Sequence, residues 1–359
     1  MRITIAGGGN IGTQFAVHCA EKGHEVTVYT SCPELYDGHL NIVDEAGETT
    51  HRGEIRLATY DPEKAFRNAE MILITMPATM MRKLADTIYE HTGPDTLIGV
   101  VPGNGGAECA FRKCIEKGNT FFGIERVPAI ARLIKKGKTV RSTGYREELH
   151  VAAGPKSDAA GCAAIIEDIF DIRTPVIPNY LNLTMTPSNP ILHTTRLKTL
   201  FGDWREDKTY ESVPLFYEEW DDASSELLIA CDEEVQSICR ALPEFELSYV
   251  KSLRKHYESP TVEAMTKKIS SIPAFKGLTT PVTATDSGLI PDLHSRYFTA
   301  DFSYGLTIIK QIASFAGVST PYIDEVMAWY KGIAVEKEEF RFSEYGINSR
   351  EDFDRFYLQ

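Results

Sequence analysis

The stretch RITIAGGGNIGTQFAVHCAEKGHEVTVY, residues 2–29, decides the fold of the N-terminal part of the chain. Residues 2–6 are predicted to form a buried strand, and residues 25–29 a second strand. Between them apolar side chains recur at helical spacing, and Gly23 marks the end of the predicted helix. A strand, a glycine-rich turn, a helix and a strand within about 30 residues are typical of a doubly wound parallel sheet.

The turn has the pattern Gly7-x-Gly9-x-x-Gly12, which binds dinucleotides when it links a strand to a helix. In this pattern the first glycine permits the tight turn, the second lets the backbone approach a pyrophosphate, and the third allows close packing of helix on strand. The pyrophosphate then lies over free N–H groups at the helix N-terminus. A glycine-rich turn without a ligand is the alternative. The predicted cofactor-binding residues here are Gly7, Gly9, Asn10, Ile11 and Gly12.

The end of the second strand bears on the choice between NAD and NADP. An acidic residue there would bind the ribose 2′-hydroxyl of NAD, but the chain continues YTSCP (residues 29–33) and the nearest acid is Glu34. Thr30 and Ser31 could instead donate hydrogen bonds to a 2′-phosphate, although no lysine or arginine is adjacent in the sequence. We therefore expect NADP as the cofactor, with NAD as the alternative.

The remaining pattern divides the chain near residue 180. Continuous apolar runs at residues 71–75 and 97–101 predict further parallel strands that are covered on both faces. More strand-like segments and a helix follow, near residues 120–124, 138–142, 148–153 and 156–170. Beyond them the periodicity is mainly helical, as at residues 224–242 and 304–316 and from Thr320-Pro321 onward.

The expected fold class is therefore α/β. A Rossmann-type doubly wound parallel sheet over residues 1–180 binds NAD(P), and a mainly α-helical domain over residues 181–359 carries the substrate and catalytic residues. A length of 359 residues and a hydrophobic content of 43% are enough for two cores.

The composition excludes several classes of protein. A net charge of -13 argues against a general nucleic-acid binder, which needs a basic face. No apolar run approaches the roughly 20 residues that cross a bilayer, and no signal peptide is evident, so we expect a cytoplasmic protein. The seven cysteines lack redox or zinc spacing, so we expect reduced cysteines that act as small hydrophobic side chains, and no metal site.

The segment TPSNPILH, residues 186–193, opens the second domain. Ser188 or Asn189 can cap a helix that has Pro190 in its first turn. Asn189 and His193 are then four residues apart and about 5–6 Å from each other on one face. An amide and an imidazole near a helix N-terminus suit an anionic carbonyl substrate, because the helix dipole favours its carboxylate and the imidazole can move a proton. A purely structural histidine is the alternative.

A second cluster is HSRYFTAD, residues 294–301. Arg296 could bind a carboxylate through two parallel hydrogen bonds. Asp301 could hold a histidine ring in one tautomer and stabilise its protonated form. The alternative is that Asp301 only caps the helix that follows it.

With these elements and the segment ERVPAIAR at residues 125–132, the sequence resembles the octopine/nopaline (opine) dehydrogenase family through most of its length. The resemblance implies that His193 and Asp301 form a catalytic dyad, that Asn189 contacts substrate, and that Arg296 binds a carboxylate. It also implies a Rossmann domain followed by a helical domain. The shared elements are the glycine motif, ERVPAIAR at residues 125–132, N-P-x-x-H at residues 189–193 and R-Y-x-x-x-D at residues 296–301.

The implied activity is reductive condensation of an amino acid with a 2-oxo acid, using NAD(P)H. Arg126 and Ala129 depart from the family pattern and leave the amino acid open. The expected partners are these small-molecule substrates, without nucleic acid or membrane, and a homodimer is left open. One alternative is a 2-hydroxyacid or ketopantoate-type dehydrogenase, for which Lys198 is the nearest candidate lysine. A catalytically silent NADP-binding sensor is a second.

Overall fold

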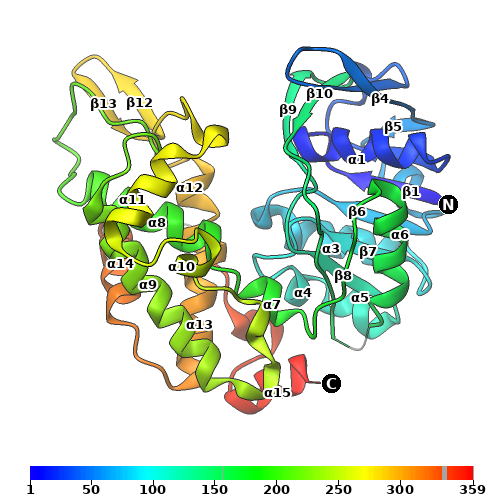
Figure 1. Cartoon of the computed structure of the whole chain (residues 1–359). Coiled ribbons are helices and arrows are strands. Elements are labelled where there is room, and N and C mark those ends of the chain that lie inside the picture. The colour runs from blue at the N-terminus through cyan, green and yellow to red at the C-terminus, as the bar shows by residue number, and fades with distance from the viewer. Residues whose placement is uncertain (156, 334–337, 359) are drawn as a thin grey trace. The chain divides into compact units, whose positions relative to one another are not determined.

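The computed structural model describes residues 1–155, 157–333 and 338–358, and the chain divides into two compact units. The first unit contains Met1–Thr184 together with Asp354–Gln359, and the second contains Met185–Phe353 (Figure 1). The boundary expected from the sequence lies near residue 180. The structure starts the second unit at Met185 and returns the end of the chain to the first.

A seven-stranded sheet organises the first unit, in the order β11-β8-β7-β6-β1-β2-β5. Its strands pair in parallel except for β11, which runs antiparallel to β8. The predicted Rossmann-type parallel sheet is thus confirmed, with one antiparallel edge. The strands are β1 (Arg2–Ala6), β2 (Glu25–Tyr29), β5 (Leu57–Thr59), β6 (Met71–Ile74), β7 (Leu97–Val100), β8 (Phe121–Ile124) and β11 (Val151–Ala153).

Both faces of this sheet are buried, which explains the continuous apolar runs of β6 and β7. Ile3 and Ile5 of β1 pack on one side with Phe15 of helix α1. Ile72 and Ile74 of β6 pack on the other side with residues of α3. The helices on the first side are α1 (Asn10–Glu21) and α6 (Ala160–Phe170), and those on the second are α2 (Pro62–Phe66), α3 (Met81–His91), α4 (Ala107–Ala110) and α5 (Arg112–Lys117).

A second sheet covers the outer side of α1 and departs from the sequence-based prediction. It has the order β4-β3-β10-β9, and α1 contacts all four strands, so this helix lies between two sheets (Figure 1). The sequence predicts the strand near residues 138–142 but not the sheet, because β4 is a polar, largely exposed segment without an apolar run. The strands are β3 (His39–Val43), β4 (Thr49–Glu54), β9 (Ile130–Lys135) and β10 (Thr139–Thr143).

One predicted helix has a different start. The sequence places it from about residue 156, which lies outside the described residues, whereas α6 begins at Ala160 and ends at Phe170. The strand expected near 148–153 is likewise shorter, because only Val151–Ala153 pair with β8.

The second unit is mainly helical, as predicted. Its long helices are α8 (Ser188–Phe201), α9 (Asp222–Ala241), α11 (Val262–Ser271), α13 (Thr307–Ala316) and α14 (Pro321–Ile333). Shorter elements are α10 (Leu253–His256), α12 (Arg296–Thr299) and the hairpin of β12 (Val282–Thr285) and β13 (Gly288–Pro291). A π-helical turn, Phe302–Leu306, leads into α13, so the segment predicted from residue 304 begins earlier and with different geometry. The last helix, α15 (Arg350–Tyr357), starts in the second unit and ends in the first.

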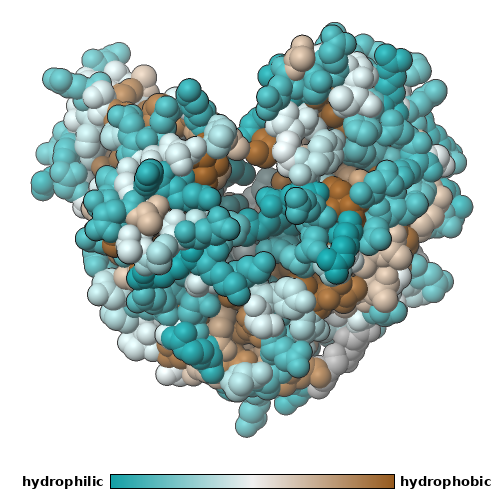
Figure 2. Space-filling view, in the orientation of Figure 1, coloured by the Kyte–Doolittle hydropathy of each residue, from teal (hydrophilic) through white to brown (hydrophobic). Residues whose placement is uncertain are grey.

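The surface of each unit is mostly polar on the face that Figure 2 shows, with apolar residues scattered among hydrophilic ones. Within the described ranges, no helix combines the length and the apolar character that crossing a membrane requires. All seven cysteines are free, and most of them are buried, in line with their predicted use as small hydrophobic side chains.

A buried carboxyl group of the first unit bonds to two distant segments of the chain. Glu108 of α4 has no exposed surface, and its Oε1 accepts hydrogen bonds from Thr184 Oγ1 and Tyr357 Oη, each at 2.5 Å. Because Tyr357 belongs to α15, these bonds fasten the end of the chain to the first unit. Burial raises the pKa of Glu108, and the two hydrogen bonds only partly oppose this effect.

This raised pKa predicts a pH-dependent stability. The folded chain holds the Glu108 proton more tightly than the unfolded chain, whose carboxyl has an ordinary pKa near 4.5. The contribution of protonated Glu108 to the stability of the folded chain is fully present below a pH of about 4.5. It is lost as the pH rises through the pKa that Glu108 has in the folded chain. Glu108→Gln keeps the acceptor but cannot ionise. We expect it to match the wild type in Tm at about pH 4.5, and to exceed it by roughly 2–4 °C, or about 1 kcal/mol, at about pH 8.

Thermal unfolding followed by circular dichroism at several pH values measures this difference. A Tm difference between the two proteins that does not change with pH would show that Glu108 does not titrate on unfolding.

Candidate active site

His193 lies near the middle of α8 and is held at both ring nitrogens. The residue is 3% exposed. Its Nδ1 is 2.7 Å from Asp301 Oδ2, and its Nε2 is 2.7 Å from Tyr217 Oη. A carboxylate only accepts hydrogen bonds, so Nδ1 carries the proton and Nε2 accepts from the tyrosine hydroxyl. Burial raises the pKa of Tyr217, so this hydroxyl keeps its proton.

Asp301 does not cap a helix, so that alternative reading of its role is wrong. It precedes the π-helical turn Phe302–Leu306 but makes no side-chain hydrogen bond to it, and its carboxylate is turned to His193 instead. A close approach supports this arrangement. A Cβ on Gly305 would be 2.9 Å from Pro190 Cγ, so only a glycine lets the turn lie this near to α8. Short π-helical turns occur frequently at functional sites.

Tyr217 was not found by the sequence reasoning, and a buried arginine explains its position. Arg196 of α8 has no exposed surface and donates to the backbone carbonyls of Phe216 and Glu219 at 3.1 and 2.6 Å. Its Nη1 also donates to Asp221 Oδ2 at 2.9 Å. These bonds fix the segment that carries Tyr217. Arg196 itself could have indicated that a further segment packs here, because it is a charged residue one turn after His193 on the buried face of the same helix.

Aromatic rings shield the imidazole. The ring of Tyr297 lies 4.3 Å from that of His193, centroid to centroid, and Phe216 stacks on Tyr297 at 4.9 Å. Tyr217 in turn stacks on Phe275 at 4.1 Å. These contacts help to bury the His193 ring, and an electrostatic interaction is stronger where water is excluded.

Asn189 shares α8 with His193, four residues before it, as the sequence predicts. The predicted cap is wrong, however. The helix begins at Ser188, Pro187 occupies the cap position, and no side chain caps the first turn. Asn189 is exposed and therefore accessible to a ligand, whereas His193 is buried.

Arg296 begins α12 and is exposed. Its guanidinium lies over the ring of Tyr297 at 5.4 Å, and Tyr297 contacts His193. Arg296 forms no ion pair within the described part of the chain. An unpaired guanidinium one aromatic ring away from the imidazole is therefore available to an anion.

The glycine turn of the first unit fits a dinucleotide. A Cβ on Gly12 would be 1.7 Å from the backbone oxygen of Gly7, which confirms the close packing of α1 on β1, and Gly7 has a positive φ of 122°. At Gly9 nothing lies within 4 Å of an added Cβ, so the backbone is open to a ligand. The first N–H groups of α1 lack intrahelical acceptors and can face a pyrophosphate. Asn10 Oδ1 accepts from Leu133 N at 2.7 Å, so Asn10 offers its backbone and not this oxygen.

The predicted 2′-phosphate residues differ in accessibility. Thr30 is buried at 6% exposure, and its hydroxyl lies against Gly8, whereas Ser31 is exposed. The structure adds a cation that the sequence reasoning missed: Lys136 Nζ lies 3.4 Å from the Sγ of Cys32. Lys136 is in the turn between β9 and β10, about a hundred positions further along the chain, so no local pattern could reveal it.

Arg126 is engaged within the first unit. Its Nε lies 3.2 Å from Glu125 Oε1, and His150 Nδ1 lies 2.7 Å from the other oxygen of Glu125. Burial alone would raise the pKa of Glu125, but the His150 hydrogen bond and the Arg126 charge together lower it to about 2. The Glu125 carboxylate thus neutralises part of the Arg126 charge, which Arg126 would need in order to bind an anionic group of the substrate.

Two family models of known proteins match the two parts of the chain. Residues 176–334 match the family model of the NAD/NADP octopine/nopaline dehydrogenase α-helical domain, and residues 2–105 match the N-terminus of NAD-dependent glycerol-3-phosphate dehydrogenase. Tauropine dehydrogenase from Arabella iricolor is 25% identical over 91% of this chain and 90% of its own sequence. Octopine dehydrogenase from Pecten maximus is 24% identical over 92% and 89%.

A solved structure of octopine dehydrogenase with NADH and L-arginine shares the fold. Its TM-score is 0.84 at 22% identity, and the match covers 98% of this chain and 97% of the other. The helical-domain match includes the segment from α8 to the π-helical turn, which holds His193 and Asp301. The α-helical domain of residues 176–334 belongs to the octopine/nopaline dehydrogenase family, and the chain is an NAD(P)-dependent oxidoreductase that is similar to opine dehydrogenases over about nine-tenths of its length.

Proposed function

We propose that this enzyme joins an amino acid to a 2-oxo acid by reductive condensation with NAD(P)H, and that His193 and Asp301 are its catalytic dyad. The observation that supports the dyad most directly is the buried imidazole between Asp301 and Tyr217. In this reaction the amine adds to the ketone, and the carbinolamine loses water to give an imine. The nicotinamide, when bound, supplies the hydride that reduces the imine carbon.

The chain's own contribution is proton transfer and positioning. His193 Nε2 can first act as a general base and take up the proton that the α-ammonium of the amino acid loses before the amine adds to the ketone. As a general acid it can then deliver this proton to the carbinolamine hydroxyl, which leaves as water. A substrate oxygen that replaces the Tyr217 hydroxyl at Nε2 would accept this proton. Asp301 holds the other nitrogen, so the ring cannot turn and its protonated form is stabilised.

Arg296 and Asn189 are the proposed substrate-binding residues. Both are exposed, and both lie within a few residues of the dyad along the chain. A guanidinium binds a carboxylate with two parallel hydrogen bonds, and an amide adds a donor. Together they would hold the 2-oxo acid carboxylate so that its carbonyl oxygen faces His193.

For the cofactor we propose a preference for NADP over NAD. The residues directly after β2 include no carboxylate to bind a 2′-hydroxyl, the nearest acid being Glu34, whereas Ser31 is exposed and Lys136 approaches the neighbouring Cys32. Gly137 explains this approach, because a Cβ there would be 2.4 Å from the backbone oxygen of Leu35. Lys138 is paired with Asp37, which leaves Lys136 as the ammonium group of this turn that can meet a phosphate.

The hydroxyacid or ketopantoate-type alternative is weaker. Lys198, its candidate lysine, lies 3.5 Å from Glu325 Oε1 and 6.0 Å from the ring of Trp329, so the ammonium is engaged away from the imidazole. The cytoplasmic location and the homodimer remain predictions from the sequence.

The first prediction tests the reaction class. Oxidation of NADPH with a 2-oxo acid should be negligible until a suitable amino acid is added, because the imine is the group that is reduced. Mass spectrometry of the product should show the two substrates joined, with the loss of one water and the gain of two hydrogens. A 2-hydroxy acid formed equally fast without any amino acid would support the alternative enzyme.

The second prediction tests the dyad. His193→Ala should lower kcat about 10²–10⁴-fold, the usual contribution of general acid–base catalysis, with nearly unchanged cofactor affinity. Asp301→Asn should share this loss, because it removes the negative charge that stabilises the protonated ring, and its amide NH2 can hold the imidazole in the wrong tautomer. The double variant should be little worse than the worse single variant. Multiplicative losses would mean that the two residues act independently.

The third prediction tests Lys136. Removing one ammonium from a phosphate contact should weaken NADPH binding about tenfold, which corresponds to about 1.4 kcal/mol, and should leave NADH binding unchanged. Fluorescence titration of both cofactors with Lys136→Gln measures this, and Lys135→Gln, its exposed neighbour, is the matched control. An equal loss for both cofactors would indicate a general change in the domain. Tighter binding of NADH than of NADPH by the wild type would exclude the preference itself.

A further inference from the structure

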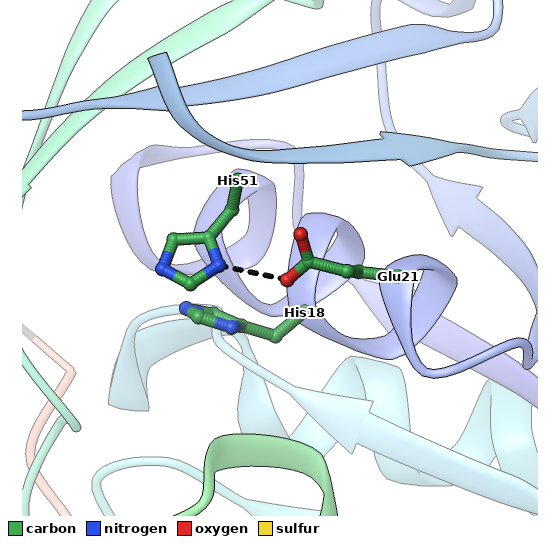
Figure 3. A group of neighbouring side chains, drawn as sticks. All are labelled: His18, Glu21 and His51. Atoms are coloured by element: carbon green, nitrogen blue, oxygen red, sulfur yellow. Dashed lines mark hydrogen bonds and ion pairs between the residues drawn. The ribbon is translucent and has the colours of Figure 1, made fainter. Parts of the chain in front are cut away.

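Two histidines and a glutamate lie together at the end of α1 opposite to the glycine turn. His18 and Glu21 are three residues apart in the last turns of this helix, and His51 lies on β4, which packs against it. Figure 3 shows the two imidazole rings and the carboxylate facing one another. None of these side chains takes part in the proposed cofactor or substrate binding.

The three groups are close enough to share one ion. His51 Nδ1 is 2.7 Å from Glu21 Oε2, and the ring centroids of His18 and His51 are 4.6 Å apart. One potential ligand atom from each residue lies within 4.8 Å of the other two. Small side-chain rotations of the half-exposed Glu21 and His51 would bring the three atoms to metal-binding distances, which are about 2.0–2.2 Å for nitrogen and oxygen ligands of zinc.

Neighbouring groups already orient these side chains. Tyr145 Oη is 3.0 Å from His18 Nε2, which leaves the Nδ1 of His18 to face the cluster. The backbone N–H of Arg52 donates to Glu21 Oε1 at 3.4 Å. Ligand histidines usually bond through their second nitrogen to such a partner, which fixes the ring.

We propose that His18, Glu21 and His51 bind one divalent ion of the zinc class, with water completing the tetrahedral coordination. Two imidazoles and one carboxylate are a donor set that zinc accepts. The 2.7 Å contact between Glu21 and His51 is otherwise an ordinary surface ion pair, but such a pair does not account for the buried His18 beside it. The sequence predicted no metal site, because its spacings do not join His51 to α1.

The bound ion would connect two elements of the first unit. It would clamp α1 to β4 at one end of the helix, and the N–H groups at the other end face the cofactor. Because the ion binds the folded unit and not the dispersed ligands of the unfolded chain, it should raise the Tm of the protein.

The experiment uses the full chain, freed of any affinity tag and dialysed against a chelator. Isothermal titration with Zn²⁺ and native mass spectrometry should show one tightly bound ion per chain. His51→Gln is the main variant, because this half-exposed residue can change without disturbing the core. It should weaken Zn²⁺ binding by at least about 100-fold and abolish the rise in Tm, and Tyr145→Phe should weaken binding about tenfold.

Two controls exclude other sites. His39→Gln changes an exposed histidine of the neighbouring strand β3, and Cys32→Ser removes a half-buried thiol, so both should bind Zn²⁺ like the wild type. The proposal is overturned if the wild type binds no Zn²⁺ at micromolar concentrations. It is also overturned if His51→Gln binds as tightly as the wild type, or if Cys32→Ser loses the ion.

Discussion

The hydrogen bond between His193 and Asp301 imposes the strictest constraint on the second unit. It joins residues that are 108 positions apart, and the other side of the ring is held by Tyr217, from a third segment. A buried imidazole with two satisfied nitrogens requires all three segments to be placed within a few tenths of an ångström. The arrangement therefore depends on residues that take no part in the chemistry and only position the other segments. The buried Arg196 fixes the segment that carries Tyr217. Gly305, which has no side chain, lets the segment that carries Asp301 lie against α8.

In the first unit a single helix, α1, is positioned with comparable precision. Helix α1 is covered by a sheet on each side, so its position is set by packing along its whole length. Its N-terminus can then present free N–H groups to a pyrophosphate without the cost of ordering them on binding. The same rigidity holds His18 and Glu21 against β4 at the far end. A helix fixed in this way holds the groups at both of its ends in place.

The sequence predicts what depends on local pattern. Strands β6 and β7 of the seven-stranded sheet are continuous apolar runs, and the glycine turn has a spacing that only a few structures use, so these elements could be located in advance. The short strand β5 was not predicted, because three residues are too few to show a pattern. The second sheet could not, because a strand such as β4 has polar side chains and is stabilised by its partners. Tyr217 and Lys136 reach their sites from distant segments, and Asp301 has the same local pattern whether it caps a helix or binds an imidazole. Tertiary packing decides these cases.

The distribution of charged residues gives a further reason to propose that Arg296 and Lys136 bind anions. A chain with a net charge of -13 repels anionic ligands at long range, so each anion needs a local cation that is not already neutralised. Many cations of the described residues are neutralised by nearby carboxylates, including Arg126 by Glu125 and Lys198 by Glu325. Arg296 and Lys136 differ, since their contacts are an aromatic ring and a thiol. Unpaired cations in an acidic protein are available to bind anions, which is why we propose Arg296 for a substrate carboxylate and Lys136 for a nucleotide phosphate.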